Sequence, residues 1–390
     1  MTDVVIVSAV RSAVGRGKKG GALSGVHPVE LSSRLMRAAV DRVHVDPAIV
    51  DDVLWGCAMP EAGQGLNVAR LSLLRAGFPV EVPGATINRF CSSGLQSVAF
   101  GAQEILSGMA DVVLAGGIEM MSQVPMSGYH TRIDSQAVES YIGMGFTAER
   151  VAERWKVSRE EQDAWALASQ QKAVRAQVSG AFDAQLLPVP VTTATWNGAR
   201  KTETTTEFAR DETPRADTTA EGLANLRPVF KAKGTVTAGN SSPYSDGAAA
   251  VLLMSATRAK ALGLAPLARF VNYAVAGVDP DVMGIGPVKA VPKVLKRAGL
   301  ALGDVKLIEF NEAFASQVVA VVRELGMDPA RVNVNGGAIA LGHPLGATGA
   351  KLTTQLIYEL RSRGGGLGLV TMCIGGGMGA AGLIEVASGG

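Results

Sequence analysis

The sequence predicts an α/β fold made of two similar halves with a segment of different character between them. Along the 390 residues, short apolar runs typical of buried strands alternate with amphipathic stretches typical of helices. Two similar strand–helix units begin far apart in the chain, and a long polar region separates them. We therefore expect a first half over residues 1–117, an inserted domain over 118–248 and a second half over 249–390.

The composition is that of a globular chain that holds its ligands locally. With 47% hydrophobic and 18% charged residues, a chain of this length can bury a large core, which excludes disordered and disulfide-scaffold classes. Lys plus Arg total 37 and Asp plus Glu total 35. The net charge of +2 gives no field that would hold nucleic acid or an anionic membrane.

Cysteine and histidine usage indicates a reducing compartment and no metal. Cys57, Cys91 and Cys373 are odd in number and far apart, which argues against a disulfide framework. The four histidines do not pair with them at metal-ligand spacing.

The sequence shows no membrane-spanning or targeting segment. No apolar run approaches the roughly 18 to 20 residues that span a bilayer, and residues 3–8 already have the pattern of a core strand, which leaves no room for a signal peptide. The expected location is the cytoplasm.

The first half continues from that strand with helices and strands in turn. Residues 53–55 and 112–115 are predicted as buried strands, with a helix over 92–108 between them. An earlier helix is predicted over 28–43, where Pro28 suits the first turn and apolar residues recur at helical spacing: Leu31, Leu35, Met36, Ala39 and Val43.

An internal repeat predicts a pseudo-twofold arrangement. Cys91 follows Asp52 by 39 positions, and His343 follows Asp304 by the same 39 positions. Each is followed by a short loop with a glycine at the same offset, then by an amphipathic helix, an apolar strand and a glycine cluster. Two such copies would place Cys91 and His343 at matching helix N-termini near a shared centre. Chance similarity between two ordinary strand–helix units is the alternative.

The region between the copies is expected to recognise a ligand. It contains a helix that begins at a capping box over 158–161 and a polar stretch over 192–220, rich in Thr, Arg and Asp. Large insertions on a rigid α/β scaffold commonly carry ligand recognition.

Cys91 is the candidate nucleophile and His343 the candidate base. Cys91 lies between a predicted strand and a predicted helix, where unpaired backbone amides and the helix dipole would lower the thiol pKa from its usual value of about 8.5. His343 lies on a glycine-flanked loop that enters a helix. Cys and His within hydrogen-bond reach form a nucleophile and base pair. A small buried cysteine and a structural histidine are the alternatives.

Two further positions lie at predicted strand ends. Cys373 follows an apolar strand and precedes a glycine-rich turn whose N–H groups suit an oxyanion; a core cysteine beside a tight turn is the alternative. Asn311 follows the predicted strand 308–310, at the end that faces the ligand crevice in α/β folds. A helix cap is the alternative for Asn311. Cys57 is interpreted as core or cavity wall.

At these residues the chain resembles the thiolase family. Four blocks match in the family order, and the resemblance runs essentially from end to end: NRFCSSGLQ at 88–96, NEAFA at 311–315, GGAIALGHPLG at 336–346 and CIGGGMG at 373–379. The resemblance implies two βαβαβαββ halves that form a layered α-β-α-β-α core, with a loop domain inserted after the first half. The implied activity is thiolytic cleavage of a 3-ketoacyl-CoA by coenzyme A.

The resemblance also implies a role for each site residue. Cys91 is acylated, His343 acts as its base, and Cys373 moves the proton at the α-carbon of the acetyl unit. Asn311, through a water, and His343 stabilise the enolate, while the N–H groups of Cys91 and Gly375 form the oxyanion hole. The segment 237–242 looks like the family's pantetheine-contacting strand. The coenzyme A contacts implied are Ser242, Arg215, Ala238, Phe314 and Met283.

Three other functions fit the sequence less well. Decarboxylating ketosynthases resemble the chain but carry histidine in place of Cys373. Short-chain acetoacetyl thiolases tend to carry histidine just before the block at 144–149, where this chain has Gly143. That departure favours a degradative 3-ketoacyl thiolase of fatty acid β-oxidation, with a broad chain-length range. A non-catalytic lipid-binding or scaffold protein would gain nothing from two reactive thiols. We expect coenzyme A as a substrate, no resident cofactor, and a homodimer or homotetramer.

Overall fold

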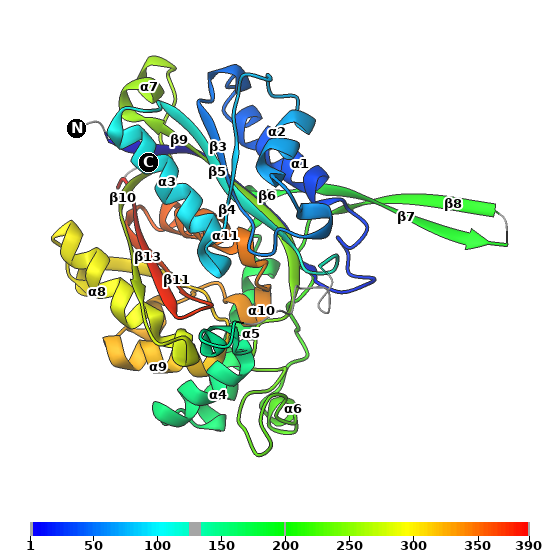
Figure 1. Cartoon of the computed structure of the whole chain (residues 1–390), viewed down its shortest axis with the longest axis vertical. Coiled ribbons are helices and arrows are strands. Elements are labelled where there is room, and N and C mark those ends of the chain that lie inside the picture. The colour runs from blue at the N-terminus through cyan, green and yellow to red at the C-terminus, as the bar shows by residue number, and fades with distance from the viewer. Residues whose placement is uncertain (1–2, 125–133, 199, 389–390) are drawn as a thin grey trace.

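The computed structural model describes residues 3–124, 134–198 and 200–388 (Figure 1). Its strands are β1 Val4–Ser12, β2 Gly15–Arg16, β3 Asp52–Gly56, β4 Ala85–Ile87, β5 Val112–Met120, β6 Leu186–Leu187, β7 Val189–Asn197, β8 Arg200–Phe208, β9 Ser245–Ser255, β10 Ala268–Gly277, β11 Val305–Phe310, β12 Gly366–Ile374 and β13 Met378–Val386. Its α-helices are α1 Pro28–Asp41, α2 Val68–Arg75, α3 Ser93–Ser107, α4 Met144–Arg154, α5 Arg159–Val178, α6 Ala220–Ala224, α7 Ala256–Ala261, α8 Gly286–Ala298, α9 Ala315–Leu325, α10 Ala338–Leu341 and α11 Leu345–Ser362.

The central sheet is built twice with the same topology. Its strand order is β4–β3–β5–β9–β1 and then β10–β13–β12–β11, and a short antiparallel pairing of β1 with β10 joins the two halves. In the first half β3 runs parallel to β5, while β9 runs antiparallel to both β5 and β1. In the second half β11 runs parallel to β12, while β13 runs antiparallel to both β12 and β10. The repeat found in the sequence therefore reflects a structural duplication.

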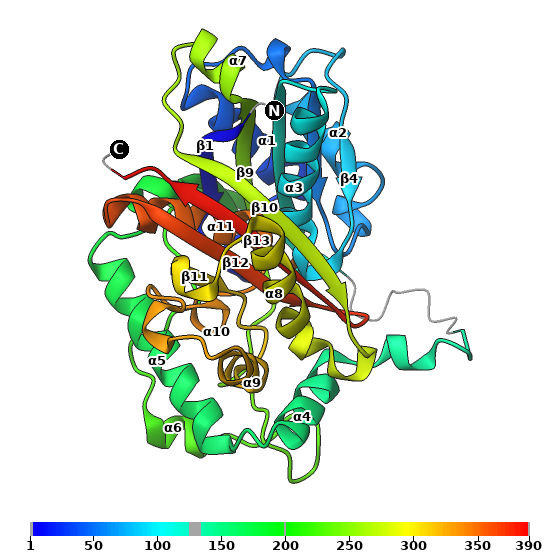
Figure 2. The ribbon, with the colours of Figure 1, turned by 90° about the vertical axis from the view of Figure 1, so that its left-hand side faces the viewer.

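The helices and the two sheet halves form five layers. One apolar core packs α1 and α2 against the first half, and another packs α8 and α9 against the second. A third core lies between the halves and is filled from both sides by α3 and α11. Figure 2 shows β10, β12 and β13 side by side, with α8 on their outer side. The predicted α-β-α-β-α layering is confirmed, and the middle layer holds the two helices that begin next to Cys91 and His343.

Local sequence signals explain the helix starts that were predicted. In α1, the ring of His27 accepts the N–H of Val29, and Pro28 occupies the first turn. The capping box before α5 is present, with Ser158 and Glu161 each accepting the other's backbone N–H. The strands predicted at 53–55, 112–115 and 308–310 lie within β3, β5 and β11.

No helix or strand is predicted from the sequence for the polar stretch 192–220, and about half of this stretch lies in a hairpin. β7 and β8 pair antiparallel along their whole length and extend away from the body of the molecule (Figure 1). Every described side chain of β8 from 200 to 207 is exposed. Such a hairpin lacks the one-sided apolar alternation from which strands are predicted. The domain limits stay a prediction, and β9 crosses the limit set at 248.

Candidate active site

The Cys91 turn is held in a strained conformation. Cys91 lies in a single 3₁₀ turn, Phe90–Ser92, between β4 and α3. Phe90 has φ +44°, a left-handed conformation that costs an aromatic residue about 1 to 3 kcal/mol. Asn88 holds the turn, because its Oδ1 accepts the Phe90 N–H at 2.9 Å and its Nδ2 donates to the Ala58 carbonyl at 3.1 Å.

Four glycines allow the Cys91 and His343 helices to meet. A Cβ on Gly94 would lie 2.9 Å from the Gly346 carbonyl oxygen, and a Cβ on Gly56 would lie 2.7 Å from the same atom. A Cβ on Gly117 would lie 2.1 Å from it. Real Cβ contacts are never this short, so only glycine fits at this crossing. Gly94 and Gly346, which the repeat placed at the same offset, pack against each other where the two helices begin.

His343 is fixed in one tautomer by its two neighbours. Its Nδ1 lies 2.6 Å from Oγ1 of Thr348, and that hydroxyl donates its own proton to the Pro344 carbonyl at 2.9 Å. The ring therefore carries its proton on Nδ1 and donates it to Thr348. Its Nε2 keeps a lone pair and lies 3.2 Å from Nδ2 of Asn311. Burial lowers the pKa of His343 to about 3, so the imidazole is a neutral base at pH 7.

Asn311 faces the site. It follows β11 directly, its Nδ2 contacts His343, and its Oδ1 is buried without a hydrogen-bond partner among the described residues. A buried amide oxygen is costly unless a ligand or water pairs with it. The helix-cap alternative does not hold, because α9 begins at Ala315 and its N-cap is Phe314.

The predicted lowering of the Cys91 pKa is wrong. Burial raises the pKa of the Cys91 thiol to about 11, although the backbone N–H groups of Gly375 and Cys91 face the sulfur and oppose that rise. The helix-dipole argument considers only the local chain, whereas packing of the second half removes water from the sulfur. Cys91 thus rests as a thiol and needs a base. It is more acidic than Cys57, whose pKa is raised further by burial and by the Glu119 charge.

Cys373 lies inside a strand and not after it. It belongs to β12 and pairs with Gly379 of β13, and its side chain is 0% exposed. Burial is the main reason why its pKa lies well above the usual value, and the nearby Cys91 sulfur adds to the shift. Cys373 is therefore protonated near neutral pH. The glycine turn that follows, at 375–377, brings the Gly375 N–H to the Cys91 sulfur.

An apolar cluster surrounds Cys373. It includes Phe314 and Met283, two of the residues implied as substrate contacts, together with Ala148, Val236, Ala313, Met144 and Phe230. The rings of Phe146, Phe230 and Phe314 follow one another edge to face, at centroid separations of 6.4 and 6.2 Å. Phe146 is 52% exposed and Phe314 is 9% exposed. The aromatic row leads from the surface to Cys373.

A pocket of about 510 Å³ lies beside the site. Its lining includes the predicted Arg215 and Ala238, and adds Arg16, Lys18 and Tyr244. Three of these side chains are cationic, which suits a polyanionic ligand. Arg16 and Lys18 carry no local sequence signal, because they reach the pocket from β2 and the loop after it, nearly 200 residues away from Arg215.

One segment connects this pocket to the predicted catalytic residues. Residues 237–242 form a turn and not the predicted strand, with isolated bridges from Thr237 to Pro228 and from Ser241 to Phe314. Ser242 donates its N–H to the Ala313 carbonyl at 3.0 Å. Tyr244 bridges to His343, and the Ser245 hydroxyl accepts the His343 N–H at 3.0 Å.

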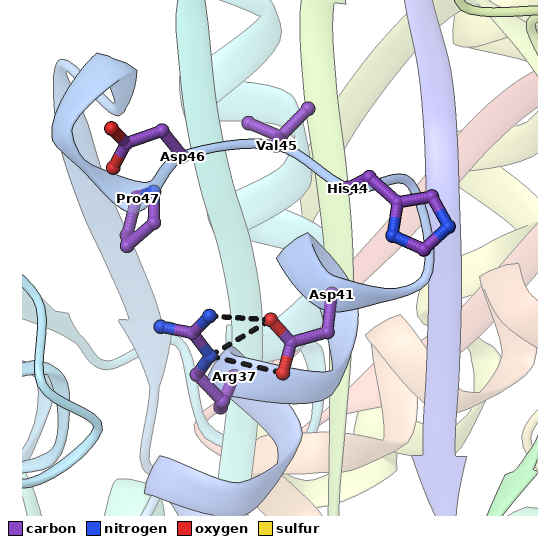
Figure 3. A pocket seen from close by; sticks show the side chains of 6 residues that line it. All are labelled: Arg37, Asp41, His44, Val45, Asp46 and Pro47. Atoms are coloured by element: carbon purple, nitrogen blue, oxygen red, sulfur yellow. Dashed lines mark hydrogen bonds and ion pairs between the residues drawn. The ribbon is translucent and has the colours of Figure 1, made fainter.

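A second, larger depression is unrelated to this chemistry. It measures about 620 Å³ and is lined by Arg37, Asp41, His44, Val45, Asp46 and Pro47 (Figure 3). Arg37 and Asp41 form a mutual ion pair, and both are about half exposed. None of the predicted site residues lies there. Over the described ranges, no group of three His, Cys, Asp or Glu residues has the arrangement of a metal site, and no helix is long and apolar enough to cross a membrane.

Comparison with known proteins identifies the family. The thiolase N-terminal domain matches residues 4–257, and the thiolase C-terminal domain matches residues 264–386. The 3-ketoacyl-CoA thiolase of Bacillus subtilis is 53% identical over 99% of this chain and all of its own length. The acetyl-CoA acetyltransferase of Pseudomonas aeruginosa is 49% identical over 98% of each chain.

Solved structures agree with this result. The acetyl-CoA acetyltransferase of Bacillus anthracis has a TM-score of 0.90 at 44% identity, and human mitochondrial 3-ketoacyl-CoA thiolase has a TM-score of 0.89 at 42% identity. Each comparison covers 99% of both chains. With two family domains that together span nearly the whole sequence, this chain belongs to the thiolase family.

Proposed function

We propose that this chain is a 3-ketoacyl-CoA thiolase, which cleaves 3-ketoacyl-CoA with coenzyme A to acetyl-CoA and a shortened acyl-CoA. The observation that carries the proposal is the convergence of a base, a nucleophile and a second thiol. His343, Cys91 and Cys373 come from three distant parts of the chain. Cys91 and Cys373 are close enough for their charges to interact, and the His343 loop packs on the Cys91 helix where Gly346 meets Gly94.

Acylation begins with a neutral pair. The Cys91 thiol passes its proton to Nε2 of His343, and the thiolate attacks the 3-keto carbon of the substrate. The two N–H groups that face the sulfur, those of Cys91 and Gly375, can donate to the oxygen that becomes negative. Neither resting group is charged, so the site avoids holding an unpaired ion in a buried position.

Carbon–carbon cleavage needs a second proton carrier. When the bond between C2 and C3 breaks, its electron pair passes to the acetyl-CoA enolate, and the acyl group stays on Cys91 as a thioester. The Cys373 thiol is protonated at rest and can give its proton to C2 of the enolate. Nδ2 of Asn311 and the protonated His343 would stabilise the enolate oxygen. Coenzyme A then gives its thiol proton to the site and takes the acyl group from Cys91.

The adjacent pocket is assigned to coenzyme A. Arg16, Lys18 and Arg215 would neutralise its phosphates, and the segment around Ala238 and Ser242 would guide the pantetheine toward Cys91. Coenzyme A is a substrate in this proposal, and the chain needs no resident cofactor.

A broad chain-length range is proposed over strict acetoacetyl specificity. The aromatic row beside Cys373 offers apolar surface to an acyl chain. At Gly143, the nearest atom to an added Cβ would belong to the Phe146 ring, at 3.4 Å, so this position leaves space that an imidazole would fill. The 53% identity to a 3-ketoacyl-CoA thiolase supports the same choice. Acetoacetyl-CoA thiolase is the second candidate, supported by the relatives named acetyl-CoA acetyltransferase.

We also propose a cytoplasmic homo-oligomer that acts in fatty acid β-oxidation. Within the described chain, β4 is an edge strand paired with β3 alone, and its residues are partly exposed. An open edge can pair with a second copy of the chain. Exposed apolar side chains around α2 and β4 add surface for such an interface: Leu66, Leu71, Leu74 and Val80. Size-exclusion chromatography with light scattering distinguishes a homodimer or homotetramer from a monomer.

The proposed function is tested by counting thiols. Mixing the enzyme with 3-ketohexanoyl-CoA and coenzyme A should consume free thiol and yield acetyl-CoA and butanoyl-CoA in equal amounts. Cys91→Ser should abolish the reaction. A lipid-binding or scaffold protein would bind the thioester and leave both the thiol count and the substrate unchanged, which would refute the proposal.

A further inference from the structure

Glu119 is a buried carboxylate that the mechanism above does not use. It lies near the end of β5 with its side chain 0% exposed. A carboxylate in such a place is costly unless several donors pair with it. Its position in the first half of the fold, next to the loop that carries His343 in the second half, makes its partners informative.

The carboxylate joins two separate loops. One oxygen, Oε2, accepts the N–H of Gly346 at 2.8 Å and the N–H of Ala58 at 2.9 Å. The other, Oε1, accepts the N–H of Met59 at 3.3 Å and a hydrogen bond from the side-chain amide of Gln64. All four partners are donors, so the bonds suit the ionised carboxylate and not the neutral acid. Burial raises the pKa of Glu119 to about 7, and these four hydrogen bonds oppose that rise, so the carboxylate is ionised above neutral pH.

Each loop leads directly to a catalytic residue. Gly346 lies three residues after His343, at the start of α11. On the other side, the Ala58 carbonyl accepts from Asn88, and Asn88 in turn accepts the N–H of Phe90, next to Cys91. An unbroken set of hydrogen bonds therefore runs from the Cys91 turn through Glu119 to the His343 loop.

We propose that Glu119 is a positioning residue, which sets the His343 loop against the Cys91 turn so that the imidazole can take the thiol proton. The inference rests on the proposed function, because it assigns a purpose to the pairing of these two residues. A misplacement of about 1 Å can cost about 10²-fold in rate, so a fixed connection between two halves of a fold has a measurable effect.

The charge of Glu119 has a second effect that separates positioning from simple stability. The titratable groups that face it are Cys57, at 4.0 Å from Oε1, and Cys91. Its negative charge raises the pKa of both thiols. Removal of the charge should make the Cys91 thiolate easier to form, while loss of the hydrogen bonds should make His343 a poorer partner. The two effects act in opposite directions on two different reactions.

The experiment compares Glu119→Gln with Asp51→Asn in the full-length enzyme. Asp51 is a matched control, because its carboxylate accepts two backbone N–H groups, of Asp111 and Val112, at the opposite end of the same strand. For each variant, rapid-quench kinetics measure acyl-enzyme formation from 3-ketohexanoyl-CoA, and iodoacetamide labelling measures the reactivity of Cys91 as a function of pH.

In Glu119→Gln, acylation should slow by about 10- to 100-fold, while the pH midpoint of Cys91 labelling should fall. In Asp51→Asn the acylation rate and the pH midpoint of Cys91 labelling should both match those of the wild type. The proposal would be overturned if Glu119→Gln formed the acyl-enzyme at the wild-type rate. It would also be overturned if the rates of acylation and of Cys91 labelling fell by the same factor. If the wild type itself forms no acyl-enzyme, the proposed function fails instead.

A milder variant covers the case in which Glu119→Gln does not fold. Gln64→Met removes one donor from the carboxylate, together with the Gln64 bonds to the Met59 carbonyl and the Met120 N–H, and leaves the bond to Gly346 in place. Its acylation rate should fall by about threefold to tenfold, as expected for one hydrogen bond of ordinary strength. An unchanged rate in a folded Gln64→Met would then refute the positioning role.

Discussion

The Nδ1 atom of His343 lies 2.6 Å from the hydroxyl oxygen of Thr348, five residues later in the first turns of α11. Because that hydroxyl donates to the Pro344 carbonyl, it can only accept from the ring. The geometry therefore selects the tautomer whose Nε2 can receive a proton. Thr348 is therefore placed to orient the imidazole, as a third residue orients the base in nucleophile and base pairs generally.

Thr348→Val should slow acyl-enzyme formation by about tenfold, because valine keeps the shape but cannot hold the Nδ1 proton, and the loss of one such bond costs about 1.4 kcal/mol. Thr353→Val is the matched control, since Thr353 lies on the same helix and its hydroxyl donates to the Gly349 carbonyl. Rapid-quench kinetics of both variants provide the test. Equal rates of acyl-enzyme formation in the two variants would show that Thr348 does not orient His343.

Cys91 should show two different pH dependences. Burial raises its pKa to about 11, so its thiolate fraction, and with it the rate of iodoacetamide labelling, should rise about tenfold per pH unit from pH 7 to 10. Acylation by substrate should change little from pH 8 to 9, because His343, with its pKa lowered to about 3, is already a neutral base and Glu119, with its pKa raised to about 7, is already ionised.

His343→Ala should make these two profiles alike. Without the base, acylation depends on the free thiolate, so its rate should drop at pH 7 and recover as the pH rises. An acylation rate in His343→Ala that equals the wild-type rate at pH 7 would contradict the assignment of the base. Preferential labelling of Cys57 with activity retained would contradict the assignment of the nucleophile.

The internal repeat allows the sequence to predict that the helices next to Cys91 and His343 begin close together. Equal spacing from Asp52 to Cys91 and from Asp304 to His343 encodes two copies of one strand–helix unit, and two copies about a pseudo-twofold axis bring equivalent helix N-termini together. The glycines at matching offsets, Gly94 and Gly346, mark the place where those helices touch. Local patterns were enough here because the fold repeats itself.

Properties that depend on distant packing were not predictable in the same way. The Cys91 pKa was predicted from its own helix terminus, but the dominant influence is burial by the whole assembled core. Glu119 and Thr348 carry no local signal, because a glutamate in an apolar strand and a threonine in a helix acquire their roles only through the partners that folding supplies. The hairpin of β7 and β8 was missed since its exposed residues lack the periodicity of a half-buried strand.

Gly143→His should narrow the range of substrates. In the wild type, 3-ketoacyl thioesters of six or more carbons should be cleaved at least as well as acetoacetyl-CoA, since each buried methylene can contribute about 0.8 kcal/mol of binding. An imidazole at 143 would approach the Phe146 ring and should lower kcat/KM for the longer substrates more than for acetoacetyl-CoA. Gly143→Ala is the control for the backbone change. A steep fall in wild-type kcat/KM beyond four carbons would favour the acetoacetyl enzyme.

Cys373 separates a thiolase from a simple Cys-His acyltransferase. Transfer of an acyl group from Cys91 to a thiol needs a nucleophile, a base and an oxyanion hole, whereas carbon–carbon cleavage also needs an acid that protonates the departing enolate. Cys373 suits that acid because burial keeps it protonated, and its pKa rises further when Cys91 is ionised. Two chemistries thus require two proton carriers at one centre.

Cys373→Ala should therefore still form an acyl-enzyme from a simple acyl thioester, yet lose cleavage and α-proton exchange by about 10² to 10⁴, the usual range for a general acid. Cys373→Ser should be nearly as impaired, since a hydroxyl is a far weaker acid than a thiol. Deuterium exchange into acetyl-CoA is measured beside the acylation burst of the same variant, so that the burst reports whether the rest of the site is intact. Exchange at the wild-type rate in Cys373→Ala would show that another residue carries the proton, and Cys373 would then be a structural thiol between β12 and its glycine turn.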